Sequence, residues 1–327
     1  MREVRYSRTI FIILLVSIFI FGSLPANAQT KYPTRPVTFI CPWGAGGGTD
    51  QIARMLAVLL EKDLGQPVTV VNRTGGSGAV GHTAGATASP DGYTITFVTL
   101  DITMMHWMGL TKINYNDYKA VALVNLDPAG FLVRTGAPWK NVKEVLDYAK
   151  ANPGKLKASG SGKGTIWDLA RAGMLKAAGI PVAAMPWVPT EGAAPSLAEL
   201  AAGGLDVVTC SLPEARSMIE ANKVKALGIM SDKRADLFPD VPTLREQGIP
   251  WSTGTWRGVG VPKETSDDIV KILEKSCEKA VASAEFKDFM KKTGFGTIWK
   301  PAKEFGKFMA EQDAQMGVLM KEAGIVK

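Results

Sequence analysis

The sequence predicts an α/β protein in which mostly parallel strands are flanked by helices. From Val37 onward, short apolar runs suited to strands alternate with segments whose apolar residues recur at helical spacing. Short turns rich in glycine or proline separate these segments, and this alternation is typical of α/β domains. The chain has 327 residues, of which 46% are hydrophobic and 21% are charged. This length is sufficient for two domains of about 100 to 150 residues each.

The first 28 residues differ from the rest of the chain. Arg2, Arg5 and Arg8 make a basic start, residues 10–22 are apolar, and residues 26–28 read Ala-Asn-Ala. This order is typical of a secretory signal peptide, so we expect cleavage after residue 28 and export of the mature chain. The apolar run is shorter than the roughly 20 residues that span a membrane, and no cysteine near the cleavage point could carry a lipid. Cleavage would remove three arginines and one glutamate and lower the formal net charge from +7 to +5.

Two strand and helix units open the mature chain. Residues 37–41 are expected to form a strand, followed by a glycine-rich turn at 43–49. The next helix should be capped by Thr49 or Asp50 and should end at Gly65. A second strand at 68–72 leads into a second glycine-rich turn, a helix of small residues and a strand at 93–99.

A second set of units begins with a strand at 121–133. Asn141 and Glu144 predict a capping box for a helix that ends at 152–154. Further strands are expected at 156–159, 182–187, 206–211 and 224–230, with helices after residue 165 and before residue 203.

The last part of the chain is expected to contain one strand, at 256–261, and helices that begin at Ser266, Ser283 and Pro301. Because the second set of strands already looks complete, we expect these helices to pack on the first domain. The first domain would then be discontinuous, and the chain would cross between the domains twice.

Three glycine-rich turns share one physical property. They lie at 44–49, 74–78 and 160–165, and each follows a strand and leads into a helix. Glycine permits positive φ and a close approach of a ligand to the backbone. We expect the free amide groups and the positive ends of the helix dipoles to point at one anion. The alternative, that these are only tight loops, stays open.

Two of these turns also resemble nucleotide-binding motifs. Residues 76–81 match the G-x-G-x-x-G pattern, but they do not follow their strand directly and no acidic residue ends a clear later strand. In the third turn Gly164 follows Lys163, where a phosphate-binding loop needs Ser or Thr. The positive charge of the chain is spread without a basic stripe, which argues against nucleic-acid binding. We therefore expect no nucleotide cofactor and no nucleic-acid partner.

Catalytic and metal-binding arrangements are not recognisable in the sequence. The chain has two histidines, His82 and His106, and neither stands in a spacing that suits a metal or a nucleophile and base pair. Ser77 lacks the G-x-S-x-G frame of a hydrolase nucleophile. The three cysteines lie far apart in apolar contexts, so we expect buried free thiols at Cys41, Cys210 and Cys277.

Several motifs in register resemble the periplasmic receptors of tripartite tricarboxylate transporters, also called Bug receptors. The resemblance begins with YPTRPVTFICPWGAGGGTDQIARMLA and PVTVVNRTGGSGAVGHTAGATASPDGYT. It continues with GSGKGTIWDLA, MPWVPTEGAAPSLAELAAGGLDVV, LPEA, VPTLREQGIP and WRGVGVPKETSDDIVKIL. It covers essentially the whole mature chain and is more specific than any single turn.

The resemblance implies a type II periplasmic-binding-protein fold with two lobes and a ligand cleft between them. The implied domains are residues 29–129 plus 246–327 for the first lobe and residues 130–245 for the second. The implied ligand is a small carboxylate held largely by backbone amides. The implied ligand-binding residues are Trp43, Gly44, Ala45, Gly46, Gly47, Gly48, Thr49, Asp50, Thr74, Gly75, Gly76, Ser77, Gly78, Ala79, Ser159, Ser161, Gly164, Thr165, Trp187 and Ser211.

Some positions depart from the family pattern and bear on the choice of ligand. Trp43 stands where many relatives carry Phe, and Trp187 where many carry Tyr. Trp167 and Asp168 stand where several relatives carry His and Leu, and His82 where a smaller residue is usual. Trp43 and Trp187 would either stack on the ligand or only pack the loops.

The expected function is that of a periplasmic, non-enzymatic and monomeric receptor, without metal or cofactor. It would deliver a dicarboxylate, tricarboxylate or aromatic acid to the membrane permease of a tripartite tricarboxylate transporter. Two alternatives stay open. One is a secreted enzyme that uses Ser161, Lys163 or His82, and the other is a ligand sensor for a signalling partner.

Overall fold

The computed structural model describes residues 32–326, so the expected signal peptide and its cleavage site lie outside the described residues. Arg35–Lys327 form one compact unit. Among residues 32–326, no helix combines the length and the hydrophobicity that a bilayer crossing requires.

The first of two connected sheets mixes parallel and antiparallel strands. It contains β1 (Val37–Cys41), β2 (Val68–Asn72), β3 (Thr94–Thr99), β8 (Gly254–Pro262), β9 (Thr297–Pro301) and the first part of β4 (Tyr118–Arg134). β1 pairs in parallel with β2 and β3, whereas β8 is antiparallel to both β3 and β4. The expectation of mostly parallel strands is therefore wrong, because the late strands β8 and β9 both run antiparallel to the strands they join.

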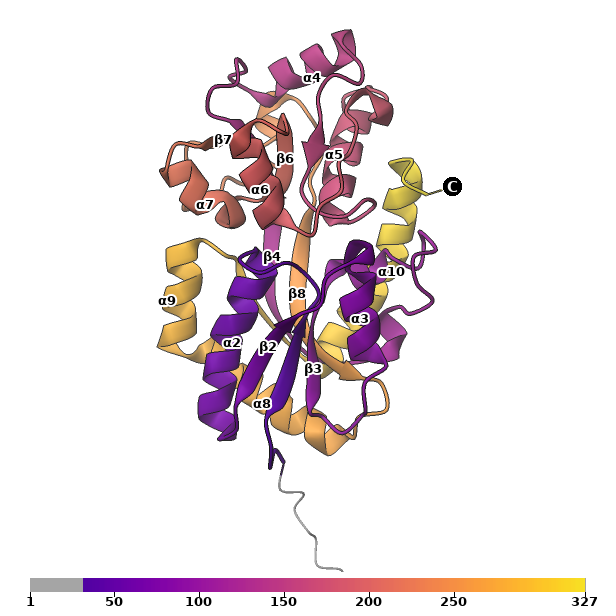
Figure 1. Ribbon diagram of the computed structural model, residues 1–327, viewed down its shortest axis with the longest axis vertical. Coiled ribbons are helices and arrows are strands. Elements are labelled where there is room, and N and C mark those ends of the chain that lie inside the picture. Colours follow the sequence, from indigo (N-terminus) through magenta and orange to yellow (C-terminus); the bar gives the residue numbers. More distant parts are fainter. Residues whose placement is uncertain (1–31, 327) are drawn as a thin grey trace, which may run out of the picture. The chain divides into compact units, whose positions relative to one another are not determined.

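The second sheet is built around the other end of β4. It adds β5 (Ala158–Ser159), β6 (Val207–Ser211) and β7 (Val224–Ile229). Residues 118–128 of β4 pair with β8, whereas residues 129–134 pair with β6 and β7. A single strand thus runs through both sheets (Figure 1). We call the parts around the two sheets the first and second lobes; the exact domain limits given above stay a prediction.

Helices cover both sheets (Figure 1). The first lobe carries α2 (Gly48–Leu64), α3 (Ala79–Ala86), α8 (Asp267–Ala282), α9 (Ala284–Thr293) and α10 (Ala302–Glu322). The second carries α4 (Val142–Ala151), α5 (Ile166–Ala177), α6 (Ala193–Ala202) and α7 (Leu212–Glu220). α8 and α10 contact β4, and α8 also contacts α2, so the closing helices pack where the sequence predicted.

Local capping signals explain the starts of several helices. Ser266 and Ser283 accept the N–H groups of Ile269 and Phe286, which fixes the predicted first residues of α8 and α9. Asn141 accepts the N–H of Glu144 at the start of α4, but Glu144 accepts the N–H of Lys140 instead of that of Asn141, so only half of the expected capping box is present. α2 differs from the prediction, because its N-cap is Gly47 and no side chain caps it.

Three expected features of the second half are wrong or were missed. The expected strand at 182–187 is a 3-10 helix at Val182–Ala184 with only an isolated bridge from Trp187 to Ala158. Proline has no N–H to donate, so Pro181 and Pro186 disfavour a strand there. The helix α7 and the strand β9 were not predicted. The expected free thiols are confirmed: Cys41, Cys210 and Cys277 are unpaired and buried.

Candidate ligand-binding site

Both lobes line one small cavity, which we call the interlobe cavity. Its lining residues from the first lobe are Trp43, Gly44, Gly47, Gly48, Thr49, Thr99, Asp101, Thr255 and Arg257. From the second lobe they are Ser161, Ile166, Trp167, Gly192, Ala193 and Glu214. The cavity volume is about 20 Å³, which is enough for one or two water molecules but not for an organic acid. The described conformation is therefore closed around this cavity.

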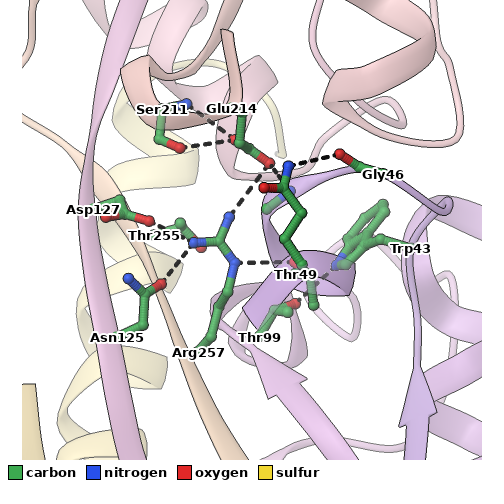
Figure 2. A network of polar contacts seen from close by, with 12 residues as sticks. Trp43, Gly46, Thr49, Thr99, Asn125, Asp127, Ser211, Glu214, Thr255 and Arg257 are labelled. Carbon is green, nitrogen blue, oxygen red and sulfur yellow. Dashed lines mark hydrogen bonds and ion pairs between the residues drawn. The ribbon is translucent and has the colours of Figure 1, made fainter. Parts of the chain in front are cut away.

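Arg257 forms the centre of the polar network at the cavity (Figure 2). Its Nη1 donates to Asn125 Oδ1 and Asp127 Oδ2, each at 2.6 Å, and its Nε donates to Thr49 Oγ1 at 3.0 Å. Burial raises the pKa of Asp127, and the adjacent guanidinium opposes this shift. The remaining nitrogen, Nη2, lies 3.4 Å from Oε1 of Glu214 in the other lobe. Three contacts within the first lobe therefore fix the guanidinium, while one edge faces the second lobe.

Glu214 reaches from the second lobe to the N-terminus of α2. Its Oε1 accepts the N–H of Gly48 at 2.9 Å. Its Oε2 accepts the N–H and the hydroxyl of Ser211 at 3.1 and 3.0 Å, and the bond from the N–H belongs to a capping box at the start of α7. A carboxylate of the second lobe thus satisfies the first N–H of a first-lobe helix, where the helix dipole favours negative charge.

Asp101 makes the reciprocal contact. Its Oδ1 accepts the N–H of Ile166, the first residue of α5 in the second lobe, at 3.0 Å. Its Oδ2 accepts the hydroxyl of Thr99 at 2.9 Å. Burial raises the pKa of Asp101, and the hydrogen bonds to its carboxylate oppose that shift. Each lobe therefore places a carboxylate on a helix N-terminus of the other lobe.

A chain of hydrogen bonds connects Asp101 to the second glycine-rich turn. Thr99 accepts the indole N–H of Trp43 at 3.2 Å, and its own N–H donates to Nε2 of His82 at 3.2 Å. Nε2 is therefore an acceptor, and Nδ1 carries the proton that is donated to Gly78 O at 2.8 Å. Burial lowers the pKa of His82 to about 4, so the ring is neutral at pH 7 and both its nitrogens have backbone partners.

Only part of the predicted ligand-binding set lines the interlobe cavity. Its predicted members are Trp43, Gly44, Gly47, Gly48, Thr49 and Ser161. Gly75, Gly76, Ser77 and Gly78 line a second cavity instead, together with Gly162, Pro189, Thr190 and Glu191. Trp43 borders both cavities, and a Cβ on Gly78 would lie 2.9 Å from its ring. The indole therefore lies between the turns at 44–49 and 74–78. These two turns do not line the same cavity.

The other predicted residues make contacts within the protein. Asp50 accepts the N–H of Gly46 and binds Arg54 and Asn72, and these bonds hold the pKa of Asp50 low although burial alone would raise it. In the second lobe, hydrogen bonds to protein partners are made by Ser159, Gly164, Thr165, Trp187 and Ser211. Ala45 is exposed, and Thr74 and Ala79 line neither of the two cavities.

The expectation that the N–H groups of the glycine-rich turns are free is wrong at several positions. The N–H groups of Gly44 and Gly48 donate to Glu191 O and to the Glu214 carboxylate, both across the lobes. Those of Gly46 and Gly164 donate to Asp50 and Asp168. Within residues 32–326, the N–H groups of Thr49 and Asp50 in the first turn of α2 have no protein acceptor. The closed form therefore uses protein oxygens at several positions where an external anion was expected.

The charged part of the cavity was not predicted from the sequence. Asp101, Glu214 and Arg257 were not among the predicted site residues, although all three line the cavity. One signal was available: Arg257 interrupts an apolar strand next to Trp256, and a charge on a buried strand requires a partner. Within residues 32–326, no group of His, Cys, Asp and Glu side chains is arranged to hold a metal ion.

Comparison with known proteins gives the closed cavity a context. The model of a family described as "Tripartite tricarboxylate transporter family receptor" matches residues 52–325. The periplasmic binding protein BugD is 31% identical, with 90% of this chain and 100% of that chain covered and a TM-score of 0.84.

Two proteins of Rhodopseudomonas palustris, each 26% identical to this chain, are also similar in structure. The one solved with malate has a TM-score of 0.82 over 88% of this chain and 99% of its own. The one solved with adipate has a TM-score of 0.85 over 90% and 99%. These similarities confirm the expected type II periplasmic-binding-protein fold with two lobes.

Proposed function

Because the chain belongs to the receptor family of tripartite tricarboxylate transporters, we propose that it is a periplasmic receptor for a small organic carboxylate. The ligand would bind between the lobes, at the interlobe cavity, and the receptor would deliver it to the membrane permease of such a transporter. We also propose that the chain is monomeric and that its signal peptide is cleaved after Ala28.

The observation that carries this proposal is the presence of carboxylates on the donors of the cavity. The first N–H groups of α2 and α5 each hold a carboxylate of the opposite lobe, from Glu214 and Asp101. A hydrogen bond to a charged group contributes about 1.5 to 3 kcal/mol, and the donors that make these bonds lie at the interlobe cavity. The malate and adipate bound by two relatives have the same functional group.

Ligand entry would require the lobes to separate. Opening would break the contacts of Gly44 with Glu191 and of Gly48 with Glu214, as well as that of Ser77 Oγ with Lys163 O. A ligand that makes its full set of contacts only in the closed form would then shift the open and closed populations. Residual space in the closed form is small, so an acid can enter only if the protein groups that fill the cavity move.

The geometry gives no support to the enzymatic alternative. Both ring nitrogens of His82 are engaged by backbone groups, so this side chain has no free position from which to act as a general base. Ser161 Oγ is hydrogen-bonded to Thr165 Oγ1 rather than to a base. A receptor without catalysis is the function that this arrangement supports best.

Calorimetry on the mature chain tests the proposal. Malate, adipate, citrate and benzoate would each be titrated after a thermal-shift screen. We expect at least one acid to bind with a micromolar Kd, which corresponds to about −8 kcal/mol, and to be recovered unchanged. Chemical conversion of the acid, or no binding to any carboxylate, would contradict the proposal. Comparing uptake with gene induction in a deletion strain would separate delivery from sensing.

A further inference from the structure

The Glu214 carboxylate differs from the Asp101 carboxylate at the same cavity because Glu214 lies beside the guanidinium of Arg257. Glu214 Oε1 accepts the N–H of Gly48 at 2.9 Å and lies 3.4 Å from Arg257 Nη2. The two side chains are nearly inaccessible to solvent, with 2% of Arg257 and 4% of Glu214 exposed. An N–H group at a helix start and a desolvated guanidinium edge together make a carboxylate-binding position. In the closed form the protein itself fills that position.

We propose that Glu214 occupies the place of the ligand's carboxylate, that the ligand displaces it, and that Arg257 then pairs with the ligand. This inference rests on the proposed function, because it concerns the same cavity. The end of the Glu214 side chain, –CH2–CH2–COO⁻, has the same chemistry as one end of a small aliphatic dicarboxylate. Its displacement would also make space in the small closed cavity.

The anchoring of the two side chains explains which one moves. Arg257 is held within the first lobe by Asn125, Asp127 and Thr49. Among residues 32–326, the second-lobe hydrogen-bond partner of the Glu214 carboxylate is Ser211, which binds Oε2. When the lobes separate, Glu214 therefore leaves with α7, while the guanidinium edge and the N–H of Gly48 remain together on the first lobe.

The charges at this position make Glu214 and a ligand carboxylate mutually exclusive. Arg257 already pairs with Asp127 at 2.6 Å, so with Glu214 in place two carboxylates share one guanidinium. Asp101 lines the same cavity, and burial disfavours its charged form. A third carboxylate at Arg257 would meet strong repulsion in a site without solvent. Exchange of one carboxylate for the other leaves the charge balance unchanged.

Replacement of Glu214 by an isosteric neutral residue tests this inference. The unmodified chain, Glu214→Gln and Glu220→Gln would be titrated with malate, adipate, citrate and benzoate. Glu220 is a matched control, because it is an exposed carboxylate on the same helix and pairs with Arg216. We expect Glu214→Gln to bind the preferred acid about tenfold more tightly, since a neutral amide competes less well for Arg257 and Gly48. The control should stay within about twofold of the unmodified chain.

Arg257→Lys provides the second arm. Lysine keeps the charge but loses the planar fork, so we expect binding to weaken at least about tenfold, also in the Glu214→Gln background. Thermal melts would check that each variant is folded. If Arg257→Lys does not fold, the affinity of Glu214→Gln alone tests the inference. Equal or weaker binding by folded Glu214→Gln, with the unmodified chain binding normally, overturns this inference and leaves the proposed function standing. Failure of the unmodified chain to bind any acid overturns both.

Discussion

The N-termini of α2 and α5 meet the interlobe cavity with the same backbone geometry but different chemistry. Each donates its first N–H to a carboxylate of the opposite lobe, from Glu214 and Asp101. At α2 a fixed guanidinium lies within ion-pair distance of that carboxylate, at 3.4 Å, whereas Asp101 accepts the Thr99 hydroxyl and forms no ion pair within residues 32–326. The difference shows that a helix N-terminus alone does not define a ligand position. We propose the α2 end as the ligand position because the Arg257 guanidinium lies beside it and stays in place when the lobes open.

The largest expected effect comes from removing that cation. Arg257→Met leaves Asp127 buried without its partner and should lower the free energy of unfolding by about 3 to 5 kcal/mol. Arg54→Met removes an arginine whose side chain is half exposed and which pairs with Asp50, so it should cost no more than about 1 kcal/mol. Urea denaturation of both variants measures the two values. Equal stabilities would show that the Arg257 network contributes little.

The next effect concerns the α5 end of the comparison. Asp101→Ala removes the acceptor of the Ile166 N–H and should cost about 1 to 3 kcal/mol. Asp101→Asn keeps a carbonyl oxygen for that N–H, and its amide nitrogen can donate to Thr99 Oγ1 in place of the hydrogen bond that the hydroxyl donates to the carboxylate, so its cost should be smaller. Thermal unfolding compares the variants. If Asn were as damaging as Ala, charge rather than hydrogen bonding would hold this end closed.

A pH effect should come from His82, which connects Thr99 to the second turn. Its folded pKa of about 4 lies below the ordinary value of 6.5, so the unfolded chain binds more protons between these values. Stability must therefore fall as pH falls, by about 2 kcal/mol between pH 7 and pH 5 from this group. Urea titrations at several pH values should show this slope, and His82→Gln should reduce it. An unchanged slope in the variant would assign the effect to other groups.

The smallest expected effect comes from a helix start away from the cavity. The N-terminus of α4 is capped by its own Asn141, which accepts the N–H of Glu144 at 2.9 Å. Asn141→Ala should cost about 1 kcal/mol in stability and should leave carboxylate affinity unchanged. Calorimetry and denaturation of the same sample would measure both. A change in affinity would mean that capping anywhere in the second lobe influences the cavity.

The sequence was a better guide to the elements than to the site. Local signals such as Ser266, Ser283 and Gly65 predicted helix ends correctly, because their partners lie within a few residues. The prediction of a strand at 182–187 was wrong, because two prolines there cannot donate the N–H groups that strand pairing needs, although the segment is apolar.

The cavity could not be predicted in the same way, because its charges come together only through the topology. Arg257, Asp127 and Glu214 lie on three different elements, far apart in sequence. Periodicity does not show which of these segments meet. The separation of the two turns also depends on where the Trp43 indole packs, and spacing in the sequence carries no information about that.

The position of β8 has a consequence for the order in which the protein is assembled. β8 inserts between β3 and β4, although residues 135–253 of the chain, which include the rest of the second lobe, come between β4 and β8. All strands of the second sheet, by contrast, lie between residues 118 and 229. The second lobe can therefore form early, while β3 and β4 must wait for a late strand to join them. Bringing β8 back to β4 across the 135–253 segment is entropically costly. A nascent chain that stops before residue 254 would therefore expose the β3 edge and the β4 edge of the first sheet, which β8 joins in the complete protein.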